Sequence, residues 1–218
     1  MGPYSHIVIA NELIQFIKPE NEDDYYWGAV APDVRYLVQN MPRKHTHFSA
    51  EKILNLMIKY PEQKDFLQGY LVHCVTDKIE IRRILQKRFP FSLLKKRITK
   101  NNSSLILEFF NVEILKPVRK IIMGKSNPIL TEIGIGNKEI LKFSQEIDNY
   151  IKTLSSKSSF LLYQNLGFAQ DRKLEKYKKL QNKWQESWFK NNFNLLGPLI
   201  RRVNQEIASL VREQIPKT

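Results

Sequence analysis

Histidine and aspartate are distributed along this chain in a way that suits metal binding. All four histidines fall in the first third, and residues 74–218 contain none. The candidate set, with the two aspartates that accompany them, is His6, Asp33, His45, His47, His73 and Asp77. Neutral imidazole and carboxylate oxygens are the ligands of zinc and similar ions. The first hypothesis is therefore a metal site built in the N-terminal half.

His73 and Asp77 form the best-defined pair of this set. They lie four residues apart in F-L-Q-G-Y-L-V-H-C-V-T-D, a strongly helical segment. Both side chains therefore leave one face of a helix, about one turn apart, and can reach a single ion. A buried histidine hydrogen-bonded to an aspartate on the next turn would give the same pattern. The pair alone does not separate these two interpretations.

The other members are weaker signals when each is taken singly. His45 and His47 lie in R-K-H-T-H-F, where an extended backbone would place both rings on one side, although such a basic loop is often only solvated. Asp33 follows Pro32 in an apolar run, so a cation or a helix N-terminus must accompany its carboxylate if it is buried. His6 falls in the first turn of a predicted helix, where an ordinary core or surface histidine is the alternative.

The composition is that of a basic globular protein. The 218 residues include 42% hydrophobic side chains and carry a net charge of +13. We expect one domain, residues 1–218. The charge predicts attraction to phospholipid headgroups, nucleic acid or phosphorylated substrates, unless it reflects only a biased composition.

The expected compartment follows from cysteine usage and from the apolar segments. Cys74 is the single cysteine, which excludes an internal disulfide and fits a reducing compartment. Its position between apolar neighbours favours inert packing over reactivity. The chain begins without a secretory signal pattern and has no apolar run long enough to span a bilayer, so we expect a cytoplasmic protein. Motifs for nucleotide cofactors and serine hydrolases do not occur.

Apolar residues recur at helical spacing nearly throughout, and we predict an all-α protein. We expect Ser5 to cap the first helix, Pro19 to stop it, and residues 20–26 to form an acidic loop. After that loop we predict a helix that is capped by Ser49 and runs to residue 60. Further helices are predicted at 62–88, 104–123, 137–156, 171–191 and 198–213. We also expect a loop at 127–136 and place Pro198 in the first turn of the last helix.

The stretch Arg82–Lys100 holds eight Lys or Arg, no acid and several apolar side chains. This pattern predicts attraction of an anionic substrate and peripheral contact with a lipid surface. A solvated loop between helices is the alternative.

Four pieces of sequence, in this order, resemble one family. They are Y-S-H-I-V-I-A, G-A-V-A-P-D, H-T-H-F and F-L-Q-G-Y-L-V-H-C-V-T-D, within residues 4–80. The set looks like the zinc-dependent phospholipase C family, which is all-α and shares its fold with single-strand-specific fungal nucleases. The resemblance implies a multi-helix bundle in which residues 1–80 form the metal-binding half and helices of 101–218 complete the bundle.

The resemblance also implies a role for each candidate residue. The implied metal ligands are His6, Asp33, His47, His73 and Asp77. Asp77 would bridge two ions, with Asp33, His47 and His73 completing the shell of the first. In the phospholipases, a carboxylate in the position of Asp33 is also the candidate general base.

Some features depart from the secreted members of that family. The second histidine of H-T-H-F matches the family element, so His45, with Arg43 and Lys44, is left to contact the ligands or the substrate. The secreted enzymes have further histidine and glutamate ligands after the H-x-x-x-D element, and this chain has no later histidine. We therefore expect one or two zinc ions rather than three. The secreted enzymes also use a terminal amino group as a ligand, and here Met1 lies a few residues before His6.

The leading hypothesis is a metal-dependent phosphodiester hydrolase, with zinc as the metal and a phospholipid or related phosphodiester as substrate. The ion would acidify bound water and polarise the phosphoryl oxygen, and Asp33 would orient or deprotonate that water. One alternative is a catalytically silent protein in which the metal only holds the N-terminal half together. Another is a nuclease or nucleic-acid binder in which Trp184, Trp188 and Phe189 stack on bases, although core packing also explains these aromatics.

Overall fold

The protein is all-α over the part of the chain that the structure describes. The computed structural model describes residues 1–38, 41–89, 98–100, 102–115, 127–167, 175, 178, 179, 182 and 193–216, and none of these is in a β-strand. The α-helices are α1 (Pro3–Ile17), α2 (Glu22–Val30), α3 (Ala50–Lys59), α4 (Lys64–Thr76), α5 (Ile81–Arg88), α7 (Ser103–Ile114), α8 (Pro128–Glu132), α9 (Asn137–Lys152), α10 (Ser156–Asn165) and α13 (Phe193–Gln214). Short 3-10 helices are η1 (Ala31–Leu37), η2 (Arg43–His45) and η3 (Pro61–Gln63). Among the described residues, no helix is both long and apolar enough to cross a membrane.

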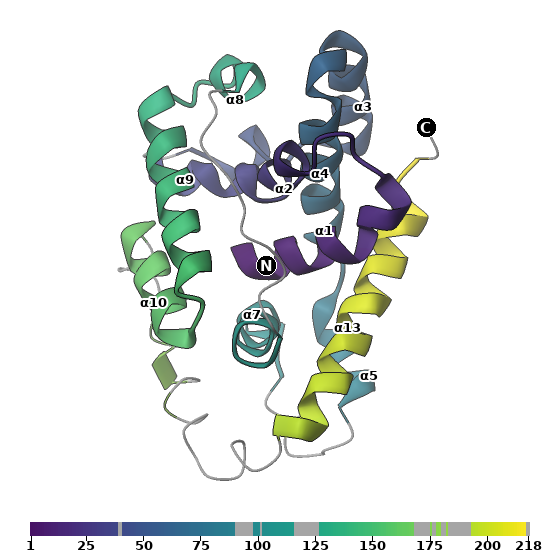
Figure 1. Ribbon diagram of the computed structural model, residues 1–218, viewed down its shortest axis with the longest axis vertical. Coiled ribbons are helices and arrows are strands. Elements are labelled where there is room, and N and C mark those ends of the chain that lie inside the picture. The colour runs from purple at the N-terminus through teal and green to yellow at the C-terminus, as the bar shows by residue number, and fades with distance from the viewer. Residues whose placement is uncertain are drawn as a thin grey trace.

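Helix α1 occupies the middle of the molecule and packs against α2, α4, α7 and α13 (Figure 1). Its first half, from Pro3 to Ala10, is buried throughout. The helix ends at Ile17, where Lys18 takes the left-handed conformation with φ 53° just before Pro19, as the sequence predicted. His6 is thereby placed at the centre of the fold rather than on its surface.

Helices α2 and α4 are in backbone contact because a glycine stands on each helix where they meet. A Cβ atom on Gly28 would lie 1.9 Å from the carbonyl oxygen of Phe66, and one on Gly69 would lie 1.9 Å from that of Tyr25. Any larger side chain at either position would push the helices apart. This close contact brings the end of α2, and η1 that follows it, against the last turn of α4.

The start of α1 is held by a buried carboxylate from α7. Glu108 is fully buried, and its Oε1 and Oε2 atoms accept hydrogen bonds from the backbone N–H groups of Tyr4 at 3.0 Å and Ser5 at 2.7 Å. The hydroxyl of Tyr150 on α9 donates to the same carboxylate at 2.8 Å. A carboxylate at a helix N-terminus satisfies unpaired N–H groups and interacts favourably with the helix dipole. Glu108 therefore fixes the end of α1 that carries His6.

A second buried polar chain joins α1 to α7 and α13. The Nδ2 of Asn204 donates to Oδ1 of Asn111 at 2.8 Å, and the Nδ2 of Asn111 donates to Oγ of Ser5 at 2.9 Å. All three side chains are buried, where amide and hydroxyl groups need such partners. The helices after residue 100 thus position the N-terminal half through specific hydrogen bonds as well as apolar packing.

Several local expectations for the N-terminal half were wrong. Ser5 does not cap α1, because the helix begins at Pro3 and Ser5 is buried within it. Residues 20–26 are not a loop: Asn21 caps α2 by accepting from the N–H groups of Asp23 and Asp24, and the acidic residues favour the positive end of that helix. Ser49 caps α3 as expected, by accepting from the N–H of Lys52. The helix predicted over 62–88 is divided into α4 and α5.

The later part of the chain shows similar differences. Residues 127–136 are not all loop, because Asn127 caps the short helix α8. Helix α10 was not predicted, and α13 begins at Phe193, so Pro198 lies inside the helix rather than in its first turn. Most of the predicted helix 171–191, with Trp184, Trp188 and Phe189, lies outside the described residues.

Replacing Glu108 by Ala should destabilise the protein strongly. Two N–H groups at the buried start of α1 and the Tyr150 hydroxyl would lose their acceptor, so we expect the free energy of unfolding to fall by about 3 kcal/mol or more. Urea unfolding followed by circular dichroism measures this change, with Glu51→Ala on the exposed face of α3 as the matched control. Equal unfolding midpoints for the two variants would contradict the role given to Glu108.

Candidate metal centre

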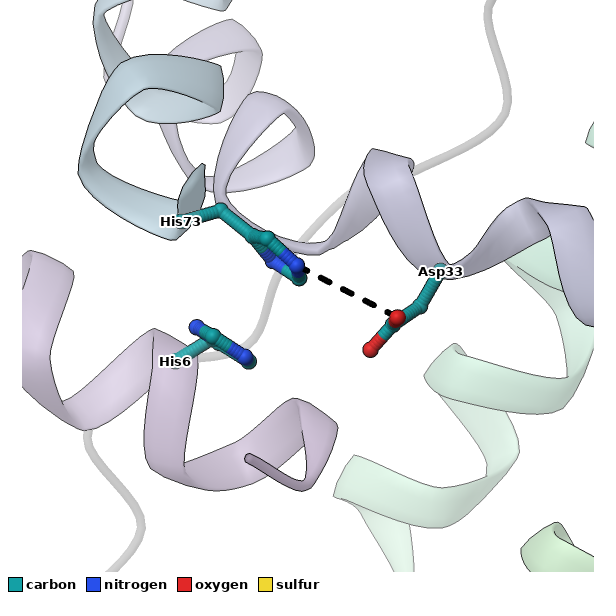
Figure 2. A group of neighbouring side chains, drawn as sticks. All are labelled: His6, Asp33 and His73. Atoms are coloured by element: carbon teal, nitrogen blue, oxygen red, sulfur yellow. Dashed lines mark ion pairs between the residues drawn. The ribbon is translucent and has the colours of Figure 1, made fainter. Parts of the chain in front are cut away.

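Five side chains from four segments of the chain meet at α1. His6 comes from α1, Asp33 from η1, His47 from the residues after η2, and His73 from the last turn of α4, where Asp77 is the C-cap. Figure 2 shows the rings of His6 and His73 and the carboxylate of Asp33 lying around one space. The structure therefore brings together the whole set that the sequence proposed as ligands.

The protonation of His73 follows from its surroundings. Its ring is fully buried, and Nδ1 lies 2.8 Å from the carbonyl oxygen of Ala29 at the end of α2. A carbonyl oxygen only accepts, so Nδ1 carries the proton of this contact. Burial, followed by the nearby His6, lowers the pKa of His73 well below its ordinary value of 6.5, so the ring is neutral. Its Nε2 atom therefore presents a lone pair.

That lone pair faces other acceptor atoms. Nε2 of His73 lies 3.2 Å from Nε2 of His47, 3.6 Å from Oδ2 of Asp77 and 4.0 Å from Oδ1 of Asp33. Lone pairs and carboxylate oxygens repel one another unless a cation lies among them. A single proton on Nε2 of His47 can be donated to Nε2 of His73 at 3.2 Å or to Oδ2 of Asp77 at 3.1 Å, and it leaves the other acceptor unsatisfied. A metal ion satisfies all of these atoms together.

The spacing of these atoms suits a tetrahedral ion. Donor atoms bound about 2.0–2.2 Å from zinc in tetrahedral geometry lie about 3.3–3.6 Å from one another. The distances among His47, His73 and Asp77 are 3.1–3.6 Å, and Asp33 is slightly farther away. Two groups have all their donor atoms within 4.8 Å of one another: His47, His73 and Asp77 form one, and His6, Asp33 and His73 form the other. The residues present thus fit a metal ion.

The surroundings of His6 also suit a metal ligand. Its ring stacks on His73 with centroids 3.7 Å apart, and burial lowers its pKa below 6.5, with the terminal ammonium as the next cause. Its Nε2 lies 3.3 Å from Oδ1 of Asp77, but neither ring nitrogen has a hydrogen-bond partner among the described residues. A buried imidazole normally makes at least one hydrogen bond. Metal coordination accounts for a ring that has none.

Asp77 lies at the centre of the positive charge in this region. Its Oδ1 accepts from the amino group of Met1 at 2.7 Å, and its Oδ2 accepts from the guanidinium of Arg43. Burial alone would raise the pKa of Asp77, but the terminal ammonium and His6 outweigh it and hold that pKa well below its usual range. Asp77 is thus an anion that contacts His6 through Oδ1 and His47 through Oδ2.

Residues 43–46 of the basic loop before His47 differ in their exposure and in their contacts with the cluster. Arg43 was expected to contact the ligands or the substrate. Its guanidinium contacts Asp77, and 52% of its side chain is exposed. Lys44 and His45 are exposed, and neither contacts the cluster among the described interactions. Thr46 is buried; its hydroxyl lies 3.0 Å from Nδ1 of His47, and its carbonyl accepts from the Tyr70 hydroxyl. These contacts orient the His47 ring toward Asp77.

Sequence reasoning missed two contributors to the site. The carbonyl of Ala29 sets the tautomer of His73, and the hydroxyl of Thr46 orients His47. Neither group has a sequence signal, because backbone carbonyls occur at every residue and threonine is common in loops. The amino group of Met1, which the resemblance had raised as a possible ligand, forms an ion pair with Asp77. Gly28 and Gly69 were the available clue that α2 approaches α4 closely.

Cys74, next to His73, is a structural residue. It is buried, and burial raises the pKa of its thiol to about 12, which removes the thiolate at neutral pH. This agrees with the packing role that the sequence favoured.

Comparison with known proteins supports the metal centre. Residues 5–79 of the 218-residue chain match the model of the family described as zinc dependent phospholipase C. Comparisons with curated proteins and with solved structures gave no significant match. The matched segment contains every donor of the cluster, and zinc is the metal that both the family and this nitrogen and oxygen donor set indicate.

The metal-free protein should lose stability on acidification. His6 and His73 have pKa values lowered by burial, so below about pH 6.5 the unfolded chain binds more protons than the folded one, and stability falls as the pH falls. Each group contributes up to about 1.4 kcal/mol per pH unit. Urea unfolding of chelator-treated protein at about pH 7.5 and about pH 5.5 measures the effect. Variant His45→Gln, at an exposed position, should keep this pH dependence, whereas equal wild-type stability at the two pH values would refute it.

Proposed function

We propose that this protein is a zinc-dependent phosphodiesterase of the phospholipase C type that acts on phospholipids. The observation that carries the proposal is the bare Nε2 atom of His73, surrounded by His47, Asp77 and Asp33 within 4.0 Å. The family match over residues 5–79 supports a phospholipase-like activity and a phospholipid substrate.

The donor atoms form two groups that share His73: His47, His73 and Asp77 are one, and His6, Asp33 and His73 are the other. We infer that His47, His73 and one oxygen of Asp77 would hold a first zinc ion, with Asp33 beside it at 4.0 Å from His47 and His73. We assign His6 and the other oxygen of Asp77 to a second ion, because they are 3.3 Å apart and His6 has no other partner among the described residues. Zinc would supply the polarisation of the phosphoryl oxygen and the acidity of an attacking water.

Asp33 is the proposed general base. Its side chain is buried and lies 4.0 Å from His47 and His73 through Oδ1, while the other oxygen faces the space on the side of His6 (Figure 2). We infer that the free oxygen accepts the proton of the attacking water as its oxygen forms a bond to phosphorus. The bond between phosphorus and the diacylglycerol oxygen breaks, and that oxygen leaves with a proton. The products are diacylglycerol and a phosphorylated headgroup.

Arg43 is the proposed anchor for the scissile phosphate. Its guanidinium contacts Asp77 at the edge of the cluster, and the exposed part of its side chain faces solvent. A planar guanidinium binds two oxygens of a phosphate at once, so it can hold the substrate while it remains beside Asp77. The contact also limits the mobility of Arg43 before the substrate binds.

A catalytically silent metalloprotein is the second candidate function. The described residues outside 5–79 contribute no donor to the cluster, and the same buried ligands would hold the N-terminal half together without any reaction. This candidate predicts bound zinc but no hydrolysis. A nuclease or nucleic-acid binder, suggested by the +13 charge and the resemblance, is favoured by no specific observation on the described residues, and the aromatics offered for base stacking lie outside them.

Protein purified without chelator should contain about one to two zinc ions per chain, because the fold supplies buried, neutral imidazoles beside anionic carboxylates. Elemental analysis measures the content. Variant His73→Asn should lower it, since His73 belongs to both donor groups, while His45→Gln should not. Wild-type protein that is folded but free of zinc and similar ions would end the proposal.

Asp33→Asn should reduce hydrolysis of a generic aryl phosphodiester, and of phosphatidylcholine, by about 10²–10⁴-fold while zinc remains bound. The reason is that an amide retains a ligand oxygen but cannot accept the proton of water. Asp148→Asn, which removes only the ion pair with Lys152 on α9, is the matched control and should retain full activity. Zinc-loaded wild type without hydrolysis would favour the silent metalloprotein, and full activity of Asp33→Asn would refute the role of Asp33.

A further inference from the structure

A cavity of about 410 Å³ opens beside Asp77 and is distinct from the space between the histidines. The residues that matter for its chemistry are Asp77, Lys78, Glu80, Arg82, Lys100 and Ser103. They come from the end of α4, from α5 and from the start of α7. Asp77 therefore belongs both to the metal cluster and to this cavity, which we call the cationic pocket. Its volume is in the range of small-molecule sites.

The other charges of α5 are used in structural ion pairs. Arg83 pairs with Glu80 at 2.7 Å, and Lys87 and Arg88 both pair with Glu206 on α13. Residues 90–97 of the basic stretch Arg82–Lys100 lie outside the described residues, and the described part has two roles: Lys87 and Arg88 bind α5 to α13, whereas Arg82 and Lys100 line the pocket.

The cations of the cationic pocket are not neutralised in this way. Within the described part of the chain, Arg82 makes no ion pair, and its Nε donates to the neutral Oε1 of Gln86 at 3.4 Å. Lys78 and Lys100 are exposed and make no ion pair with a described residue. Asp77 is already surrounded by Met1, Arg43 and the histidines, and Glu80 is paired with Arg83. The pocket is therefore positive overall.

The residue types that line the pocket indicate which kind of ligand it can bind. A quaternary ammonium group such as choline is held by aromatic faces, and no aromatic side chain is among the described residues that line the pocket. Nucleic-acid bases would likewise need aromatic surfaces to stack on. The start of α7, at Ser103, adds the positive end of a helix dipole on one side. Lysine, arginine and a helix N-terminus together favour an additional anionic group.

We propose that the cationic pocket binds an anionic group on the phospholipid headgroup, so that the protein prefers phospholipids whose headgroup is negatively charged beyond the scissile phosphate. The proposal rests on the proposed function, because Asp77 then places the headgroup next to the reacting phosphodiester. Phosphorylated inositol headgroups have this chemistry, whereas phosphocholine does not.

Isothermal titration tests the pocket with headgroup products as probes. We expect zinc-loaded protein to bind inositol 1,4-bisphosphate at least about tenfold more tightly than inositol 1-phosphate, and more tightly than phosphocholine or inorganic phosphate. The double variant Arg82→Gln/Lys100→Gln should lose this tenfold preference and keep its zinc content. Lys142→Gln, an exposed lysine on α9 across the molecule from α5 (Figure 1), should leave the preference unchanged.

Several results would overturn the proposal. They are equal affinity for the two inositol phosphates, a preference for phosphocholine, equally tight binding of inorganic phosphate, tighter binding of a dinucleotide, or an equal effect of Lys142→Gln. Hydrolysis of short-chain phosphatidylinositol 4-phosphate should also exceed that of phosphatidylinositol, and the double variant should remove the difference. Failure of the proposed function is separate, because it shows as absence of zinc or of hydrolysis of every phosphodiester.

Discussion

The structure depends on one electrostatic constraint: a buried nitrogen lone pair surrounded by other electron donors. His73 donates through Nδ1 to the carbonyl of Ala29, so its Nε2 can only accept, and it faces His47, Asp77 and Asp33. One proton on His47 satisfies only one of these acceptors, whereas a cation satisfies all of them. The hydrogen bonds at the Nδ1 atoms of His73 and His47 turn both Nε2 atoms toward the centre of the cluster, which prepares them to bind a metal ion.

The scaffold meets the requirements of that site through two devices. Gly28 and Gly69 allow α2 and α4 to touch, which places the Ala29 carbonyl and Asp33 against His73. Glu108 then holds the start of α1, so that His6 stacks on His73. The second device uses residues beyond the segment that matches the phospholipase family. The C-terminal helices thus take part in shaping the site although they supply no ligand among the described residues.

The sequence predicted the all-α class and the composition of the cluster, because both depend on signals that are local or chemically rare. Helical periodicity is read over a few turns, and four histidines confined to the first third are conspicuous. Helix boundaries were predicted less well. Ser5 resembled a cap but is a buried partner of Asn111, and residues 20–26 looked like a loop although Asn21 caps a helix there.

The relationships between elements could not be predicted from the sequence. The i, i+4 spacing of His73 and Asp77 was recognised from the sequence. The end of α4 at Thr76, which makes Asp77 a C-cap that also lines the cationic pocket, depends on tertiary packing. The contacts of Ala29 and Thr46 involve groups present at every position or in many loops. The separation of the basic stretch into structural ion pairs and a pocket required the position of Glu206 on α13.

Zinc K-edge X-ray absorption spectroscopy of the zinc-loaded protein tests the central claim most directly. The account predicts nitrogen and oxygen neighbours at about 2.0–2.1 Å with the multiple scattering that imidazole rings produce, and loss of part of that scattering in His73→Asn. A spectrum of six oxygen neighbours without imidazole scattering would show that zinc lies elsewhere and would contradict a metal centre at His73.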